Sequence, residues 1–172
     1  VALCLTGLIG SLQGKSWNKS GGTQKVLDTC FTHNKKHILD KNDVDVFFHT
    51  WDVDYKNQLI DKYKPKRYQA QKVFDEIIPP NSVRVQAHYS KWYSIKECVK
   101  MKQNYELQKG FTYDFVLQSR FDLVWTTDVI FSNFDTDKFY IPRTSKYGEP
   151  WGWPNKTNNH EIGDLFYFSN SH

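Results

Sequence analysis

The chain has 172 residues, of which 39% are hydrophobic and 16% aromatic, and its formal net charge at pH 7 is +4. This length fits one domain with a core of its own. The basic residues are scattered and no apolar run approaches the ~20 residues of a membrane span, so we expect neither nucleic-acid binding nor a transmembrane segment.

The first half of the chain alternates apolar runs with amphipathic segments. Thr23 is a typical helix N-cap, and Pro65 ends a short helix because the residue before a proline avoids helical dihedral angles. In chain order we expect a strand at 1–8, a loop at 10–22, a helix at 23–39, a strand at 45–50, a short helix at 54–63, a short strand at 66–70 and an amphipathic segment at 73–78.

The second half begins with the longest predicted helix and then becomes irregular. We expect a short strand at 83–87, a helix at 90–109 that Gly110 caps, a strand ending at Ser119, a short strand at 139–142, a loop at 143–159 and a last strand at 165–168. We therefore predict an α/β fold, a mostly parallel central sheet flanked by helices, in a single domain over 1–172. A parallel strand is usually followed by a covering element, which suggests a fragment of a longer chain.

Three cysteines, Cys4, Cys30 and Cys98, are far apart in the chain and form no CxxC pair. This spacing predicts separate core thiols, and it argues against a disulfide framework and against a zinc site. No secretory signal is visible, although the chain begins at Val1, which leaves a removed leader open. We expect a cytoplasmic protein, with the lumen of the Golgi or the endoplasmic reticulum as the open alternative.

Two predicted strands end in polar residues that can bind metal ions or phosphate. The apolar run 115–117 leads into Arg120 and Asp122, and the run 46–48 leads into Asp52. Ligands of parallel sheets gather at the carboxyl ends of the strands. A carboxylate there can hold a divalent metal, and a guanidinium can hold phosphate oxygens. Asp52 either joins this site or caps the helix that follows it.

Three further features each leave an alternative open. The segment 10–16 ends in Gly-Lys-Ser but has three residues between its glycines where a P-loop has four, so we favour a flexible basic loop beside a nucleotide site over a true P-loop. His49, a lone histidine at a strand end, is interpreted as structural. Trp151 and Trp153 lie in a loop rich in Gly and Pro, where they either stack on a sugar or a base or fold back into the core.

With these residues in hand, the chain resembles a glycosyltransferase-like family of the GT-A type, found in large DNA viruses and in microbial sugar-polymer gene clusters. The specific blocks are Phe48-His49-Thr50-Trp51-Asp52 and Arg120-Phe121-Asp122. Weaker blocks at 3–7, 64–65, 92–95, 113–119 and 163–166 follow the expected order.

The resemblance implies a Rossmann-like nucleotide-binding domain that transfers a sugar from a UDP- or GDP-sugar donor to a glycan acceptor, with Mn²⁺ or Mg²⁺. In such enzymes an Asp-x-Asp motif holds the metal. Here Arg replaces the first acid, so Arg120 would pair with the diphosphate and take over part of the metal's charge. The implied roles are metal binding by Asp122, donor binding by Thr6, Gly7, Leu8, Asp52 and Arg120, catalysis by Asp164 and Arg120, and acceptor binding by Trp151 and Trp153.

Two rival functions stay open. The near-P-loop would suit a nucleotide-dependent phosphotransferase or sulfotransferase, and the two loop tryptophans would suit a non-catalytic carbohydrate-binding domain.

Overall fold

The structure is a computed structural model, and it describes residues 1–10, 23–72, 83–142 and 166–171. Within these residues a five-stranded sheet has the order β3-β2-β1-β4-β5, in which all neighbours are parallel except β4 and β5. The strands are β1 (Ala2–Gly7), β2 (Asp45–Thr50), β3 (Arg67–Ala70), β4 (Val116–Arg120) and β5 (Tyr167–Ser169).

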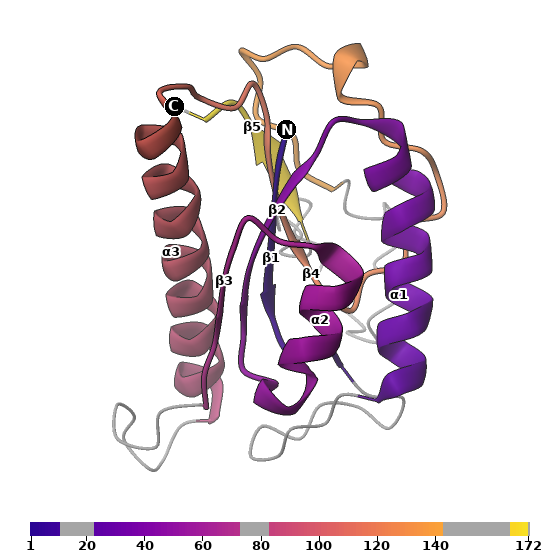
Figure 1. The fold of residues 1–172 in the computed structure, drawn as a ribbon, viewed down its shortest axis with the longest axis vertical. Coiled ribbons are helices and arrows are strands. Elements are labelled where there is room, and N and C mark those ends of the chain that lie inside the picture. Colours follow the sequence, from indigo (N-terminus) through magenta and orange to yellow (C-terminus); the bar gives the residue numbers. More distant parts are fainter. Residues whose placement is uncertain (11–22, 73–82, 143–165, 172) are drawn as a thin grey trace, which may run out of the picture.

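Helices cover both faces of the sheet, with α1 and α2 on one side and α3 on the other (Figure 1). The predicted α/β class, with a mostly parallel sheet flanked by helices, is confirmed. The helices are α1 (Gln24–His37), α2 (Lys56–Tyr63) and α3 (Val83–Lys109), and three short 3₁₀ turns lie at η1 (Leu39–Lys41), η2 (Val53–Tyr55) and η3 (Phe131–Asn133).

The core has two layers because alternate side chains of each strand point to opposite faces. In β1, Leu3 and Leu5 pack into the larger cluster with Phe48 and the buried faces of α1 and α2. Ala2 and Cys4 pack on the α3 side with Phe47, Cys98 and Tyr113. Burial on both faces explains the unbroken apolar runs at 2–5 in β1 and at 46–48 in β2. Each fully buried Leu or Phe contributes roughly 1.5–3 kcal/mol through burial.

The sequence signals for α1 and α2 agree with the structure. The backbone N–H of Val26 donates to the Thr23 hydroxyl over 3.3 Å, as expected for an N-cap. Lys64 adopts a left-handed conformation (φ 46°) directly before Pro65 and ends α2. The three cysteines are free and buried, as predicted, but they are not all separate, because Cys4 and Cys98 pack in the same cluster on the α3 side.

The predicted short strand at 83–87 is wrong, because α3 begins at Val83. Two valines favour a strand there, but no Gly or Pro separates them from the strong helical segment after Ser90, and helix formation is cooperative. The predicted strand at 139–142 is reduced to one bridge between Tyr140 and Phe168. The predictions for 10–22, 73–78 and 143–159 fall wholly or mainly outside the described residues.

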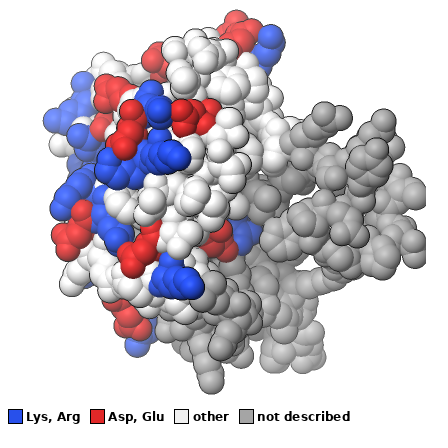
Figure 2. Space-filling view, turned by 90° about the vertical axis from the view of Figure 1, so that its right-hand side faces the viewer, with Lys and Arg blue, Asp and Glu red and all other residues white. Residues whose placement is uncertain are grey.

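Charges of both signs mix on the face covered by α1 and α2 (Figure 2). Lys62 pairs with Asp28 over 2.8 Å, and Lys41 pairs with Asp128 over 2.9 Å. Such mixing gives no single-sign patch on this face among the residues described. No helix in the described part of the chain combines the length and apolar character needed to cross a bilayer.

Candidate functional site

The strand order places a topological switch point between β1 and β4. After β1 the chain crosses to β2 through α1 on one face, whereas it enters β4 from α3 on the other face (Figure 1). In open α/β sheets ligands bind in the crevice outside the carboxyl ends of the strands at such a point. The residues there are therefore the candidate site.

The two polar strand ends noted in the sequence flank β1. Thr6 is in register with His49 of β2 on one side and with Arg120 of β4 on the other. Gly7 ends β1 with a φ of 97°, and Leu8 follows it half-buried. The predicted donor residues Thr6, Gly7, Leu8, Asp52 and Arg120 thus lie along one edge of the sheet, although their contact with a donor stays a prediction.

Arg120 and Asp122 form a forked ion pair. The guanidinium donates from Nε to Oδ1 over 2.8 Å and from Nη2 to Oδ2 over 2.7 Å. The pair is partly buried, with 31% of the Arg120 side chain and 15% of the Asp122 side chain exposed. Two parallel charge-assisted bonds fix the geometry of both groups. Asp122, the predicted metal ligand, and Arg120, the predicted phosphate ligand, are therefore paired with each other in this structure.

The loop after β1 packs directly against Asp122. Gly10 has a φ of 93°, and a Cβ added there would lie 2.8 Å from Cβ of Asp122 and 3.2 Å from its Oδ2. Burial, helped by the nearby charge of Asp122, raises the pKa of the Cys30 thiol on α1 to about 11. Asp122 thus packs against the β1 loop, and its charge also acts on a thiol of α1.

Replacing Gly10 by alanine should lower the free energy of unfolding by about 2–3 kcal/mol, because left-handed strain adds to a clash with Asp122. Gly110→Ala is the matched control, since Gly110 also has a positive φ (71°) but has nothing within 4 Å of the added Cβ. That control should lose only about 1 kcal/mol. Urea denaturation of both variants measures the difference, and equal losses would show that Gly10 does not press on Asp122.

Asp52 anchors the β1 loop from inside the protein. It is fully buried, and its Oδ2 accepts a hydrogen bond from the Ile9 backbone N–H over 2.7 Å. The Thr50 hydroxyl donates to the Gly7 carbonyl over 3.1 Å and accepts from the Asp52 N–H over 3.1 Å. The alternative that Asp52 caps the next helix is wrong, because its side chain makes no cap bond at η2. Nothing in the sequence pairs residue 52 with residue 9, so sequence reasoning missed this role.

His49 lies on the α3 side of the same edge. Its Nδ1 is 2.7 Å from the Ser94 hydroxyl, and its ring packs edge-on against Trp51 and Tyr93, with centroids 4.6 and 5.5 Å away. Burial lowers the pKa of His49 to about 4, so the imidazole is neutral at pH 7. This environment is the one that the structural interpretation of His49 predicts.

Buried polar atoms gather beside Thr6. Gln118 donates from Nε2 to the Thr6 hydroxyl over 2.8 Å. Among the residues described, two buried atoms of β4 have no hydrogen-bond partner, Gln118 Oε1 and Ser119 Oγ. Buried polar atoms normally have partners, so this edge suits a ligand that carries hydroxyl, amide or phosphate groups.

The remaining predicted residues, Asp164, Trp151 and Trp153, lie outside the described residues. Within the described ranges, no group of three or more His, Cys, Asp or Glu side chains is placed to hold a metal ion. A single carboxylate such as Asp122 still fits Mg²⁺ or Mn²⁺, since Mg²⁺ at nucleotide sites uses one or two carboxylates together with water and substrate phosphates.

A family model described as a domain of unknown function, DUF7796, matches residues 60–150. The matched segment runs from α2 through β3 and α3 to β4 and η3, so it includes both Arg120 and Asp122. No curated protein matches the chain.

Proposed function

The chain belongs to the DUF7796 family, and from the switch-point site in its matched segment we propose that it is a GT-A-type glycosyltransferase, which transfers a sugar from a nucleotide-sugar donor to a carbohydrate acceptor. The single observation that carries this proposal is the forked Arg120–Asp122 pair against Gly10, at the carboxyl edge between β1 and β4. The strand order around β1 is the one in which open α/β sheets bind nucleotides.

Sugar transfer from a nucleotide sugar leaves a diphosphate, whose negative charge must be stabilised as the bond breaks. Arg120 places a cation at the site, and its guanidinium fork matches phosphate oxygens as well as it matches a carboxylate. When a diphosphate accepts the hydrogen bonds of the Arg120 guanidinium in place of Asp122, the Asp122 carboxylate would be free to bind Mn²⁺ or Mg²⁺. The metal would supply additional positive charge at the diphosphate.

The other parts of the site divide between binding and proton transfer. The Oε1 atom of Gln118, beside Thr6, would bind a hydroxyl or base group of the donor. Asp164 would take the proton from the acceptor hydroxyl, and Trp151 and Trp153 would stack on the acceptor sugar.

A thermal-shift panel of UDP, GDP and their sugar conjugates, each with and without Mn²⁺, tests the proposal. Binding to the folded state should raise the melting temperature by mass action. Asp122→Asn should keep the fold but lose the additional shift caused by Mn²⁺. Arg120→Lys should weaken diphosphate binding, because an ammonium cannot make the forked contact, and transfer should fall about a hundredfold.

Arg67→Lys and Asp61→Asn are the matched controls, since both residues are exposed and lie away from the switch point. They should bind donor as the unchanged protein does. If no nucleoside diphosphate shifts the melting temperature even at millimolar concentration, the proposal fails. Glycan binding without nucleotide binding would favour the carbohydrate-binding alternative.

A further inference from the structure

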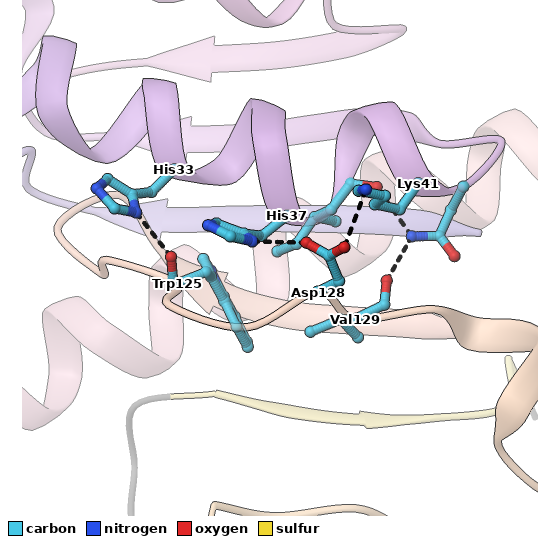
Figure 3. A network of polar contacts seen from close by, with 8 residues as sticks. His33, His37, Lys41, Trp125, Asp128 and Val129 are labelled. Carbon is cyan, nitrogen blue, oxygen red and sulfur yellow. Dashed lines mark hydrogen bonds and ion pairs between the residues drawn. The ribbon is translucent and has the colours of Figure 1, made fainter.

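Two histidines one turn apart on α1 face the segment that follows β4 (Figure 3). Nδ1 of His33 lies 2.7 Å from the carbonyl oxygen of Trp125, and Nδ1 of His37 lies 2.7 Å from Oδ1 of Asp128. The two rings are stacked, with centroids 5.7 Å apart and planes inclined by 24°. The donor-site proposal uses neither histidine.

The partners fix which nitrogen of each ring carries hydrogen. A carbonyl oxygen and a carboxylate only accept hydrogen bonds, so Nδ1 of both rings must be the donor. In the neutral imidazole the lone pair then lies on Nε2. Figure 3 shows the Nε2 side of each ring turned away from the partner of its Nδ1. Each histidine is thus in the tautomer whose Nε2 lone pair can bind a metal ion.

The partner groups are themselves held in place. Nζ of Lys41 lies 2.9 Å from Oδ2 of Asp128, and the hydrogen bond from Lys41 is the largest contribution that lowers the pKa of this carboxyl. The Val129 N–H donates to the His37 carbonyl over 2.9 Å, and Asn42 donates to the Val129 carbonyl over 2.7 Å. The segment that orients the two rings is therefore fixed at several points to the end of α1 and to the η1 turn that follows it.

Metal-binding histidines in proteins usually donate their other ring N–H to a carboxylate or a backbone carbonyl, which orients the ring and makes it a stronger ligand. His33 and His37 have one partner of each kind. Two histidines at positions i and i+4 lie on the same face of a helix, the spacing from which two imidazoles can reach one ion. Binding would require the two rings to turn their Nε2 atoms toward each other, and it would take place at a mostly buried position, because only 8% of the His37 side chain is exposed.

We propose that Nε2 of His33 and Nε2 of His37 together bind one divalent cation of the imidazole-preferring class, Zn²⁺, Ni²⁺ or Cu²⁺, with water completing its coordination. Imidazole suits these ions, whereas Mg²⁺ and Mn²⁺ prefer oxygen ligands. This site is therefore chemically distinct from the oxygen site proposed at Asp122, and it does not depend on the chain being a glycosyltransferase.

Calorimetric titration of the full chain without an affinity tag tests the site, with Zn²⁺ and Ni²⁺ as the probes. We expect one saturable ion for each chain. His33→Ala and His37→Ala should each abolish binding, and Asp128→Asn should weaken it about tenfold, as the loss of a group that orients a ligand does. His88→Ala is the matched control, since His88 is an exposed histidine on α3, and it should bind as the unchanged protein does.

Gln variants at positions 33 and 37 keep a side-chain donor for Trp125 and Asp128 but remove the imidazole, so they separate loss of the ligand from loss of the fold. They should melt near the temperature of the unchanged protein and still fail to bind Zn²⁺. Binding that persists in a His33→Gln, His37→Gln double variant, or no saturable binding in the unchanged chain, overturns the proposal. Equal binding of Mg²⁺ overturns it as well.

Discussion

Replacing Lys102 by alanine should lower the free energy of unfolding by about 3–5 kcal/mol, because the carboxylate of Glu106 would then stay buried without its cation. Nζ of Lys102 lies 2.8 Å from Oε2 of Glu106, and only 3% and 8% of the two side chains are exposed. Glu106 also accepts from the Tyr113 N–H over 2.9 Å and from the Ser171 hydroxyl. The pair thus joins α3 to the segments before β4 and after β5.

Lys100→Ala is the matched control for this prediction. Lys100 also pairs with a glutamate on α3, Glu97 at 3.1 Å, but 53% of its side chain is exposed. An exposed pair of this kind contributes about 0–1 kcal/mol. Urea denaturation measures both variants, and similar losses for Lys102 and Lys100 would show that the buried pair is not special.

The Lys102–Glu106 pair also makes the free energy of unfolding fall at acidic pH. Burial acts to raise the pKa of Glu106, but the hydrogen bonds from Lys102, Ser171 and the Tyr113 N–H outweigh it, and the pKa is lowered overall. A lowered carboxyl pKa stabilises the fold above the ordinary value of about 4.3, and this stabilisation is lost as the pH falls through the folded-state pKa. Glu106→Gln should therefore flatten the loss of stability below about pH 4.

Phe121→Ala should also lower the free energy of unfolding by about 3–5 kcal/mol, as the loss of a buried aromatic ring does. Phe121 is 1% exposed, and its ring packs edge-on against Phe48 and Tyr63, with centroids 5.8 and 6.2 Å away. It lies between Arg120 and Asp122 in the chain but packs into the core on the α1 and α2 side. The core and the candidate site therefore share one tripeptide.

Phe139→Ala is the control, since 62% of Phe139 is exposed, and its loss should stay within about 0.5 kcal/mol. Denaturant unfolding measures both phenylalanine variants. A small loss for Phe121→Ala would mean that the ring is not the contact between β4 and the helices that its burial indicates.

The sequence was most informative where one physical signal dominated. In β2 the residues 46–48 are apolar because both faces of the strand are buried, and the bounds 45–50 were predicted as the structure has them. The start of α3 was missed because local strand preference of Val83 and Val85 competes with extension of a long helix, and the sequence does not show which prevails.

For the site, the pairing of Arg120 with Asp122 could have been predicted from the sequence, because residues two apart at the end of a strand point to the same face of the sheet. The anchoring of Ile9 by Asp52 and the contact of Gly10 with Asp122 were not. Both join segments far apart in the chain, and only the strand order brings these segments together.

The position of β1 between β2 and β4 also has a consequence for biosynthesis. β2 is the first strand made that pairs with β1, but the other edge of β1 is completed only when β4 joins it. At roughly 5–20 residues per second, the stretch from Thr50 to Arg120 takes on the order of 4–14 s to translate. During this time an apolar strand presents unpaired backbone groups to any other nascent chain. The risk of misassembly is therefore greatest on the ribosome, before the strand that closes this edge has been made.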